Sequence, residues 1–215
     1  MDATSLAPIG QILLGLSLAA TAGLRAWLPL LAVGLLGRTG AIALNTDLSW
    51  LQSDTAIVAF LVATVLEIAA DKIPAVDSFT DSFGLIVKPI AGALVMSSTL
   101  SFADPAVALL LGAIAGGTTA EVVEVGKAST RLAANTLTLG TSAPVLSVAE
   151  DGAAAVSVVL ALLMPYLMGI LALGLLLLGL FALPRLGRSL RRRFRSRRGH
   201  VPSNQSDRQP RSLEP

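Results

Sequence analysis

No cysteine occurs among the 215 residues, and His200 is the only histidine. Disulfide bonds, thiolate metal sites and a cysteine nucleophile are therefore excluded. Since His200 lies in a polar stretch near the C-terminus, histidine-based acid–base chemistry and histidine metal sites are excluded from the apolar part of the chain. A Ser–His pair is equally impossible there, and no phosphate-cradling glycine loop occurs. We therefore do not expect an enzyme, and we expect no cofactor.

Charged residues are also scarce, at 14% against 53% hydrophobic residues, and the mean hydropathy is +0.74. The apolar residues form long blocks at positions 9–36, 55–66, 85–100, 106–120 and 153–183. About 20 apolar residues cross a bilayer as a helix, which satisfies its own backbone. The sequence therefore predicts an all-α, polytopic transmembrane helical bundle of about five spans over residues 1–184, with broken or re-entrant helices.

The charges are divided unevenly along the chain. Residues 1–184 hold six Lys/Arg and twelve Asp/Glu, whereas residues 185–215 hold ten Arg and two acidic residues. A basic cluster directly after a span favours the cytoplasmic side, and the arginines from Arg185 to Arg198 would attract anionic lipid head groups. Nucleic-acid binding is disfavoured, because only Phe194 is available to stack on a base. We expect a basic, disordered cytoplasmic tail over residues 185–215 and, with five spans, an N-terminus outside.

The first apolar block contains an arginine near its middle, in the run Gly23-Leu24-Arg25, and Pro29 follows. An unpaired arginine at bilayer depth costs about 2.5–3.5 kcal/mol, so Arg25 should face protein or water. Glycine and proline would interrupt the helix there and free backbone groups for a ligand. Alternatively, Arg25 reaches to the interface, or two shorter elements meet. Asp2, with no Lys or Arg before the block, argues against a cleaved signal peptide.

A second polar locus follows the second apolar block. Glu67 and Asp71 are four residues apart, which places them on one helical face, and Lys72 comes next. Pro74 cannot extend that helix, so we expect an acidic turn over residues 76–82 that includes Asp77. Carboxylates at the end of a membrane segment are costly unless they serve a site or are hydrated. Lys88 would reach back toward these carboxylates, and Pro89 is interpreted as a helix-start proline.

The fourth apolar block becomes polar at its end. Its small residues, Gly112–Gly117, allow another helix to approach closely. Glu121, Glu124, Lys127 and Arg131 then recur at helical spacing on one face. This stripe is interpreted either as surface ion pairs, which stabilise little, or as part of a functional site.

Two later segments leave their structure open. Residues 135–147 are small, polar and interrupted by Pro and Gly, which fits either a surface loop or a re-entrant segment. The block over residues 153–183 is longer than one bilayer crossing, so its helix would tilt, kink at Pro165 or begin outside the membrane.

The chain resembles a known family at Gly23-Leu24-Arg25-Ala26, Glu67 through Pro74 with Asp77, Glu121 through Arg131, and Glu150-Asp151. These residues resemble the uncharacterised small bacterial integral membrane proteins known as domain of unknown function 4126, over residues 8–184. The resemblance implies a bacterial inner-membrane protein and no established activity. A weaker likeness joins Glu67 through Lys72 to the Glu-x-Gly-Asp-Lys/Arg-Thr/Ser signature of manganese/calcium–proton exchangers. Here the two acids are four apart instead of three, and alanine replaces the glycine.

The function expected first is a small secondary transporter or permeation protein with a carboxylate/arginine site inside the bundle, for an ion or small charged solute. The expected site residues are Arg25, Glu67, Asp71, Lys72, Asp77, Glu121, Glu124, Lys127 and Arg131. Two segments share the order span, carboxylate pair, lysine, which is loosely typical of duplicated transporter halves. The alternative is a non-transporting membrane scaffold or accessory subunit with internally paired charges. The sign of the solute's charge, a metal ion at the site and a homo-oligomer all stay open.

Overall fold

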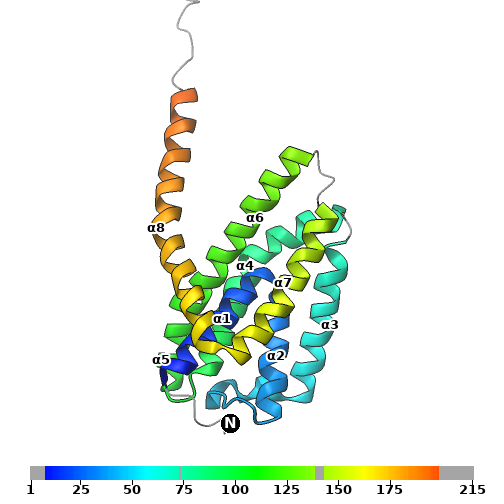
Figure 1. Cartoon of the computed structure of the whole chain (residues 1–215), viewed down its shortest axis with the longest axis vertical. Helices are drawn as coiled ribbons and strands as arrows, with labels where there is room; N and C mark the ends of the chain where they lie inside the picture. The colour runs from blue at the N-terminus through cyan, green and yellow to red at the C-terminus, as the bar shows by residue number, and fades with distance from the viewer. Residues whose placement is uncertain (1–7, 73, 139–142, 199–215) are drawn as a thin grey trace, which may run out of the picture. The chain divides into compact units, whose positions relative to one another are not determined.

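The computed structural model of the chain describes residues 8–72, 74–138 and 143–198, and these described residues form helices and no strand. The α-helices are α1 (Pro8–Leu24), α2 (Trp27–Arg38), α3 (Asp54–Ala70), α4 (Pro74–Thr99), α5 (Pro105–Leu111), α6 (Thr118–Thr138), α7 (Ala143–Leu163) and α8 (Pro165–Arg198). A 3₁₀ helix, η2 (Thr46–Gln52), precedes α3, and a π-helix, η3 (Gly112–Gly117), joins α5 to α6. α1 lies among α4, α6 and α7 and contacts all three (Figure 1). The all-α prediction is confirmed.

The first apolar block is broken where the sequence predicted. The N–H of Arg25 still donates to the carbonyl of Thr21 at 3.0 Å, but α2 begins only at Trp27. Pro29 lies in the first turn of α2, where its missing N–H costs no helical hydrogen bond. The freed N–H groups at the start of α2 are satisfied by a carboxylate from another helix, which is described with the site below.

The structure corrects two expectations about the region around α4. Helix α3 begins after Ser53, whose hydroxyl accepts from the N–H of Ala56 at 3.3 Å, and it ends at Ala70. However, α4 begins at Pro74, because proline at a first helical position loses no hydrogen bond. Residues 76–82 are therefore helical and do not form a turn. For the same reason Pro89 lies inside α4 and does not start a helix.

Helices α5, η3 and α6 follow one another without a gap. Asp104 accepts a hydrogen bond from the N–H of Ala106 at 2.9 Å, and Pro105 is the first helical residue. The small residues of η3 meet α4: a Cβ added to Gly116 would lie 2.5 Å from the carbonyl oxygen of Gly92 and 2.7 Å from the Cβ of Met96. The predicted close approach of a second helix is confirmed, and glycine is required for it.

The C-terminal third is helical almost throughout. Residues 135–138 continue α6 and residues 143–147 begin α7, whereas residues 139–142 lie outside the described residues. The last apolar block is divided, since α7 ends at Leu163 and α8 begins at Pro165. Helix α8 continues to Arg198, so residues 185–198 are helical and the expected disorder is not confirmed for them. Residues 199–215 lie outside the described part. The chain divides into two units, Met1–Leu178 and Gly179–Pro215.

Several helices have the composition of membrane spans. By length and composition, two stretches of the described chain are suited to cross a membrane, Pro105–Thr138 and Val145–Leu163. A third would be the pair Thr46–Gln52 and Asp54–Ala70, which is bent by 63°. The shorter apolar helices are Pro8–Leu24, Trp27–Arg38, Phe83–Thr99 and Pro165–Phe181. These features suggest a membrane protein, and the finer expectation of five spans is not confirmed.

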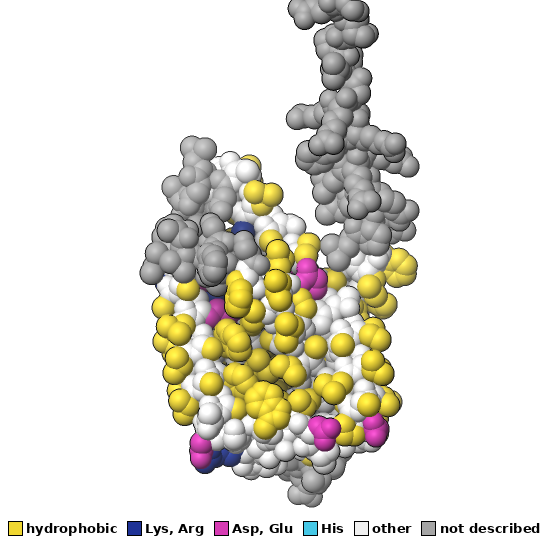
Figure 2. Space-filling model, turned by 180° about the vertical axis from the view of Figure 1, so that it is seen from behind, with side chains coloured by type: hydrophobic (Ala, Val, Ile, Leu, Met, Phe, Trp, Pro, Cys, Tyr) yellow, Lys and Arg dark blue, Asp and Glu magenta, His cyan; other side chains and the backbone are white. Residues whose placement is uncertain are grey.

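The outer surface supports the same class. Helix α3, for example, exposes large apolar side chains, including Leu61, Val65 and Leu66. Figure 2 shows hydrophobic side chains covering the middle of one face, with acidic and basic side chains along its lower edge. A soluble monomer rarely exposes apolar area on this scale, whereas a lipid-facing surface does.

Candidate functional site

Ten charged side chains from α3, α4, α6, α7 and the break between α1 and α2 form a connected polar centre. Its carboxylates are Glu67, Asp71, Glu124, Glu150 and Asp151, and its cations are Arg25, Lys72, Lys88, Lys127 and Arg131. Five negative and five positive side chains cancel in formal charge. Burying charge is costly unless it is paired and hydrogen-bonded, and these side chains are paired with one another.

Arg25 lies at the centre of this arrangement. It projects from the break between α1 and α2, and only 1% of its surface is exposed. Its guanidinium forms ion pairs with Asp71 at the C-terminal end of α3 and with Asp151 on α7. Its Nε has no hydrogen-bond partner among the described residues. The break between α1 and α2 therefore places the buried guanidinium of Arg25 between two carboxylates that come from separate helices.

Glu67 stabilises the break itself. Its carboxylate accepts from the N–H of Ala26 at 3.0 Å and from the N–H of Trp27 at 3.5 Å. These N–H groups begin α2 and have no partner within their own helix, so a carboxylate there also interacts favourably with the helix dipole. α3 therefore holds the start of α2 through Glu67 and binds Arg25 through Asp71.

The end of α6 adds two cations to the same centre. Arg131 donates from Nε and Nη2 to the two carboxylate oxygens of Glu150, at 2.8 and 2.6 Å. The same Nη2 lies 3.4 Å from Asp71, and the Nζ of Lys127 lies 3.4 Å from Glu150. Two-point contact between a guanidinium and a carboxylate is among the stronger charged hydrogen bonds in proteins. Arg131 thereby joins α6 to both α3 and α7.

A second buried pair links α4 to α6. The Nζ of Lys88 lies 2.5 Å from the carboxylate of Glu124, and both side chains are at most 5% exposed. Lys127, one turn further along α6, lies 3.9 Å from the same carboxylate. Lys88 was expected to neutralise one of the preceding carboxylates; its ion pair in the described part of the chain is with Glu124, and it also interacts electrostatically with Glu67.

Lys72 forms the more open edge of the polar centre. Its Nζ lies 2.7 Å from Asp151 and 2.9 Å from the hydroxyl of Ser147, both on α7. The side chain of Lys72 is 40% exposed and that of Asp151 is 21% exposed, whereas Asp71 is only 2% exposed. The centre is therefore closed around Arg25 and reachable near the start of α7.

Two grooves have charged side chains in their walls. A groove of about 310 Å³ runs between α2, α3 and α4, and Glu67 and Lys88 form part of its wall together with Trp27 and Phe83. A second groove of about 520 Å³ lies between α4 and the η3–α6 segment, where Glu121 faces it beside Pro89.

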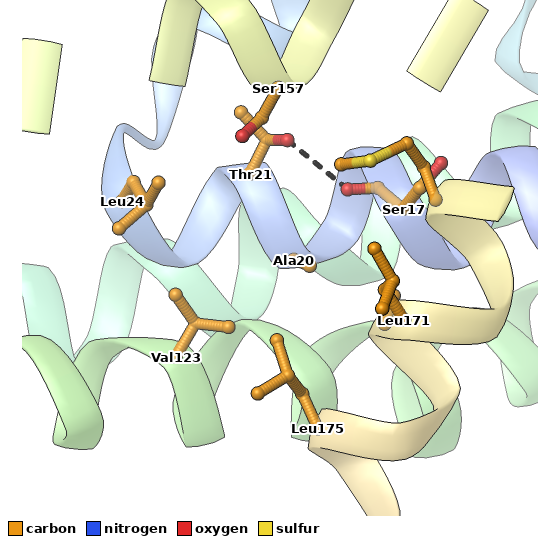
Figure 3. A pocket seen from close by; sticks show the side chains of 10 residues that line it. Ser17, Ala20, Thr21, Leu24, Val123, Ser157, Leu171 and Leu175 are labelled. Carbon is orange, nitrogen blue, oxygen red and sulfur yellow. Dashed lines mark hydrogen bonds between the residues drawn. The ribbon is translucent and has the colours of Figure 1, made fainter. Parts of the chain in front are cut away.

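The third cavity, of about 110 Å³, lies between α1, α6, α7 and α8 (Figure 3). Most of its wall is apolar, with Leu24, Val123 and Leu175 among the lining side chains. The hydroxyl of Thr21 donates to the carbonyl of Ser17 at 3.1 Å, so this hydroxyl is satisfied by the backbone of its own helix. No charged side chain of the described chain lines this cavity, in contrast to the two grooves.

Most of the predicted site residues lie close together in the structure. Seven of the predicted side chains belong to the polar centre: Arg25, Glu67, Asp71, Lys72, Glu124, Lys127 and Arg131. Glu121 lies beside the centre: its half-buried side chain lines the groove next to Pro89, and it interacts electrostatically with Glu124 and Lys88. The side chain of Asp77 lies outside the described residues.

Three members of the polar centre were missed as site residues. Lys88 was interpreted only as a local neutralising group, and Glu150 and Asp151 entered only through the family resemblance. The available signal was a pair of adjacent carboxylates within an otherwise apolar helix, Val145–Leu163.

No group of three or more acidic or histidine side chains suited to a metal ion occurs among the described residues. The carboxylates of the polar centre are instead neutralised by side-chain cations and by backbone N–H groups. The likeness of Glu67 through Lys72 to cation–proton exchangers stays a prediction.

Comparison with known proteins gives one match. Neither a curated protein nor a solved structure matches the chain. One family model, described as "Domain of unknown function (DUF4126)", matches residues 12–185 and thus includes every member of the polar centre. The match confirms the resemblance inferred from Arg25, Glu67 through Pro74, and Glu150-Asp151, and the chain belongs to this family.

Proposed function

We propose that this chain is a small secondary transporter or permeation protein for an ion or small charged solute, with the polar centre as its solute-binding region. One observation carries the proposal: charged side chains from five segments gather inside an apolar helical bundle. Ionisable side chains within a membrane bundle generally mark solute or proton pathways.

The physical argument concerns what buried ion pairs are worth. The desolvation cost of two buried charges is comparable to their attraction, and well-packed apolar side chains often stabilise a fold as well or better. An apolar bundle therefore gains little stability from ten charged side chains. A solute-binding role explains their presence, and the groove of about 310 Å³ beside Glu67 and Lys88 supports access from outside the bundle.

The proposed topology has five spans: α1 with α2 as a broken first span, then α3, α4, the α5–α6 segment, and α7 with the first part of α8. The C-terminus is cytoplasmic and the N-terminus lies outside, in the inner membrane of a bacterium. Because the chain has no cysteine, Ser5→Cys introduces a single thiol. Its labelling by a membrane-impermeant maleimide in intact cells supports an outside N-terminus, and labelling only after lysis contradicts it.

Flux through reconstituted protein tests the function. The full chain in proteoliposomes is assayed with potassium, manganese, chloride, phosphate and succinate. The double variant E67Q/D71N removes two negative charges from the polar centre and is expected to lose at least tenfold of any flux. Its matched control, D47N/D54N, removes two exposed carboxylates outside the centre and should keep wild-type flux.

Each result of this assay has a defined reading. Equal flux through E67Q/D71N and wild type, with both variants folded by circular dichroism, excludes these carboxylates from the pathway. Absence of flux for every solute favours the scaffold or accessory subunit, whose charges serve only to hold helices together.

A further inference from the structure

The groove between α2, α3 and α4 connects the apolar outer surface to two buried charges. Leu66 and Phe83 line the groove and are 62% and 55% exposed, so its mouth opens on the apolar outer surface. Glu67 and Lys88 line it as well, and they are only 8% and 4% exposed. The groove thus combines apolar walls with one buried carboxylate and one buried ammonium.

A glycine opens the groove toward the polar centre. Gly84 is part of the wall, and a Cβ added there would lie 3.3 Å from the Cε and 3.5 Å from the Nζ of Lys88. The same Cβ would lie 3.5 Å from the Oε1 of Glu124. A side chain at position 84 would therefore stand between the groove and the Lys88–Glu124 pair. A methyl group is only slightly tight against Lys88, so it would cover the pair without a severe clash.

Glu67 retains the capacity to accept hydrogen bonds from a ligand. Its Oε1 accepts from the N–H of Ala26 at 3.0 Å, and its Oε2 accepts from the N–H of Trp27 at 3.5 Å. Because the two oxygens of a carboxylate together offer about four acceptor positions, others remain. A primary ammonium group has N–H donors for them, whereas a trimethylammonium group has none.

Lys88 supplies the opposite charge at the groove. Its ammonium is paired with Glu124 at 2.5 Å, and Glu67, Glu121 and Lys127 also interact with it electrostatically. Its attraction for a further anion is thus shared with these carboxylates, and Glu67 provides the more selective contact. A ligand with one ammonium and one anionic group brings no net charge into the groove, which avoids the desolvation cost of an unpaired ion.

The two charges lie at the depth of a lipid head group. Glu67 is three residues before Ala70, the end of α3, and Lys88 is five residues after Phe83, where the apolar part of α4 begins. At about 1.5 Å per residue, each charge lies roughly 5–8 Å inside its apolar helix. Ala70 and Phe83 both line the groove, so these two helix ends meet there. This depth matches the boundary between head groups and acyl chains.

We propose that the groove between α2, α3 and α4 binds a phospholipid with an ethanolamine head group, whose ammonium donates to Glu67 and whose phosphate lies beside Lys88. The acyl chains leave the groove past the exposed side chains of Leu66 and Phe83. The inference goes beyond the proposed function and holds with or without transport, although a bound head group would compete with a solute that enters by this groove.

Lipid selectivity of the full chain tests the proposal. The purified chain in a neutral detergent is titrated with dioctanoyl forms of phosphatidylethanolamine, phosphatidylcholine and phosphatidylglycerol, and the Tm is followed by circular dichroism. Phosphatidylethanolamine should bind at least tenfold more tightly than the other two, because only its head group donates N–H bonds to a carboxylate. At about 100 times Kd it should raise the Tm by roughly 5–10 °C.

Two variants test whether the lipid occupies this groove. Glu67→Gln keeps an acceptor for the start of α2 but removes the charge, and it should weaken phosphatidylethanolamine binding at least tenfold. Its matched control, Asp47→Asn, removes an exposed carboxylate elsewhere and should not. Gly84→Ala keeps every charge and covers the ion pair behind it, so it should weaken binding at least threefold. Its matched control, Gly126→Ala, has open space around the new methyl group and should not.

Several results would overturn the proposal. Equal binding of the three lipids by the folded wild-type chain is one of them. Unchanged affinity for phosphatidylethanolamine in either folded variant is another, because the lipid would then bind elsewhere. If Glu67→Gln does not fold, Gly84→Ala decides by the same threefold criterion. Phosphoethanolamine without acyl chains should bind at least tenfold more weakly than the lipid, and equal binding would overturn the lipid assignment.

The lipid site and the transport function can fail separately. Ethanolamine selectivity in a chain that conducts no solute keeps the lipid site and removes the transport function. Solute flux that falls in E67Q/D71N, in a chain with no preference among the three lipids, removes only the lipid site.

Discussion

The buried pair of Lys88 and Glu124 allows the sharpest test of how the charges are held. Glu124→Gln removes the carboxylate that is paired directly with the buried ammonium of Lys88, since both side chains are at most 5% exposed and their charged atoms lie 2.5 Å apart. Breaking a buried pair from one side costs about 3–5 kcal/mol, and the converse variant Lys88→Met should cost a similar amount.

Replacing both partners should restore most of this loss. K88M/E124L removes both charges together, and apolar replacement of a buried pair is often neutral, so the double variant should lie within about 1 kcal/mol of wild type. Lys127, the other cation near Glu124, keeps Glu150 at 3.4 Å. The double-mutant cycle should therefore give a coupling energy of at least about 3 kcal/mol.

Reversible unfolding of the purified chain in mixed micelles, followed by circular dichroism, measures these differences. Single variants that each lose less than about 1 kcal/mol would refute the reasoning, because the pair would then be hydrated. So would a double variant that loses as much as the two single variants together. A stable K88M/E124L that has lost flux would assign the pair to function rather than to folding.

Three further predictions concern other parts of the chain. Gly116→Ala should lower stability by about 1–3 kcal/mol, because the new methyl group would meet α4, whereas Gly126→Ala, with open space around it, should be neutral or stabilising in the same unfolding assay. Glu67→Ala should cost about 0.5–2 kcal/mol through loss of the cap on α2, and Glu67→Gln, which keeps an acceptor, should cost less; equal losses would contradict the capping role. Replacing five arginines of residues 185–198 with glutamine should produce mixed orientation of a C-terminal reporter, and an unchanged cytoplasmic signal would count against the positive-inside argument.

The elements most visible in the sequence were those with a local cause. The interruption at Arg25 follows from a charge and nearby Gly and Pro within an apolar block. The stripe from Glu124 to Arg131 follows from helical periodicity alone. Each of these features depends on residues within about two turns of one another.

The errors arose where two local rules competed. Pro74 ends one helix, and the sequence was interpreted as a turn after it, but a proline that ends one helix also serves as the first residue of the next. Pro89 was then taken as the helix start because the apolar block begins near it. Its actual place inside α4 depends on where the helix started, fifteen residues earlier.

The pairing of charges was not predictable, because it depends on which helices are neighbours. Lys88 lies closer in sequence to Asp77 than to Glu124, yet it pairs with Glu124 across α4 and α6. Glu121 shares the periodic face of Glu124, yet Glu121 lines the groove beside Pro89 whereas Glu124 is buried against Lys88. Periodicity gives the face of a helix, and only packing gives its partner.

The π-helix η3 affects the direction in which the charged side chains of α6 point. A π turn contains one residue more than an α turn, so it advances every later side chain around the helix axis by about 100° relative to a continuous α-helix. Gly112–Gly117 therefore sets the azimuth of Glu124, Lys127 and Arg131. Deleting a single glycine from this stretch would keep the hydrophobicity of the span while rotating the charged sector out of alignment with α3 and α7.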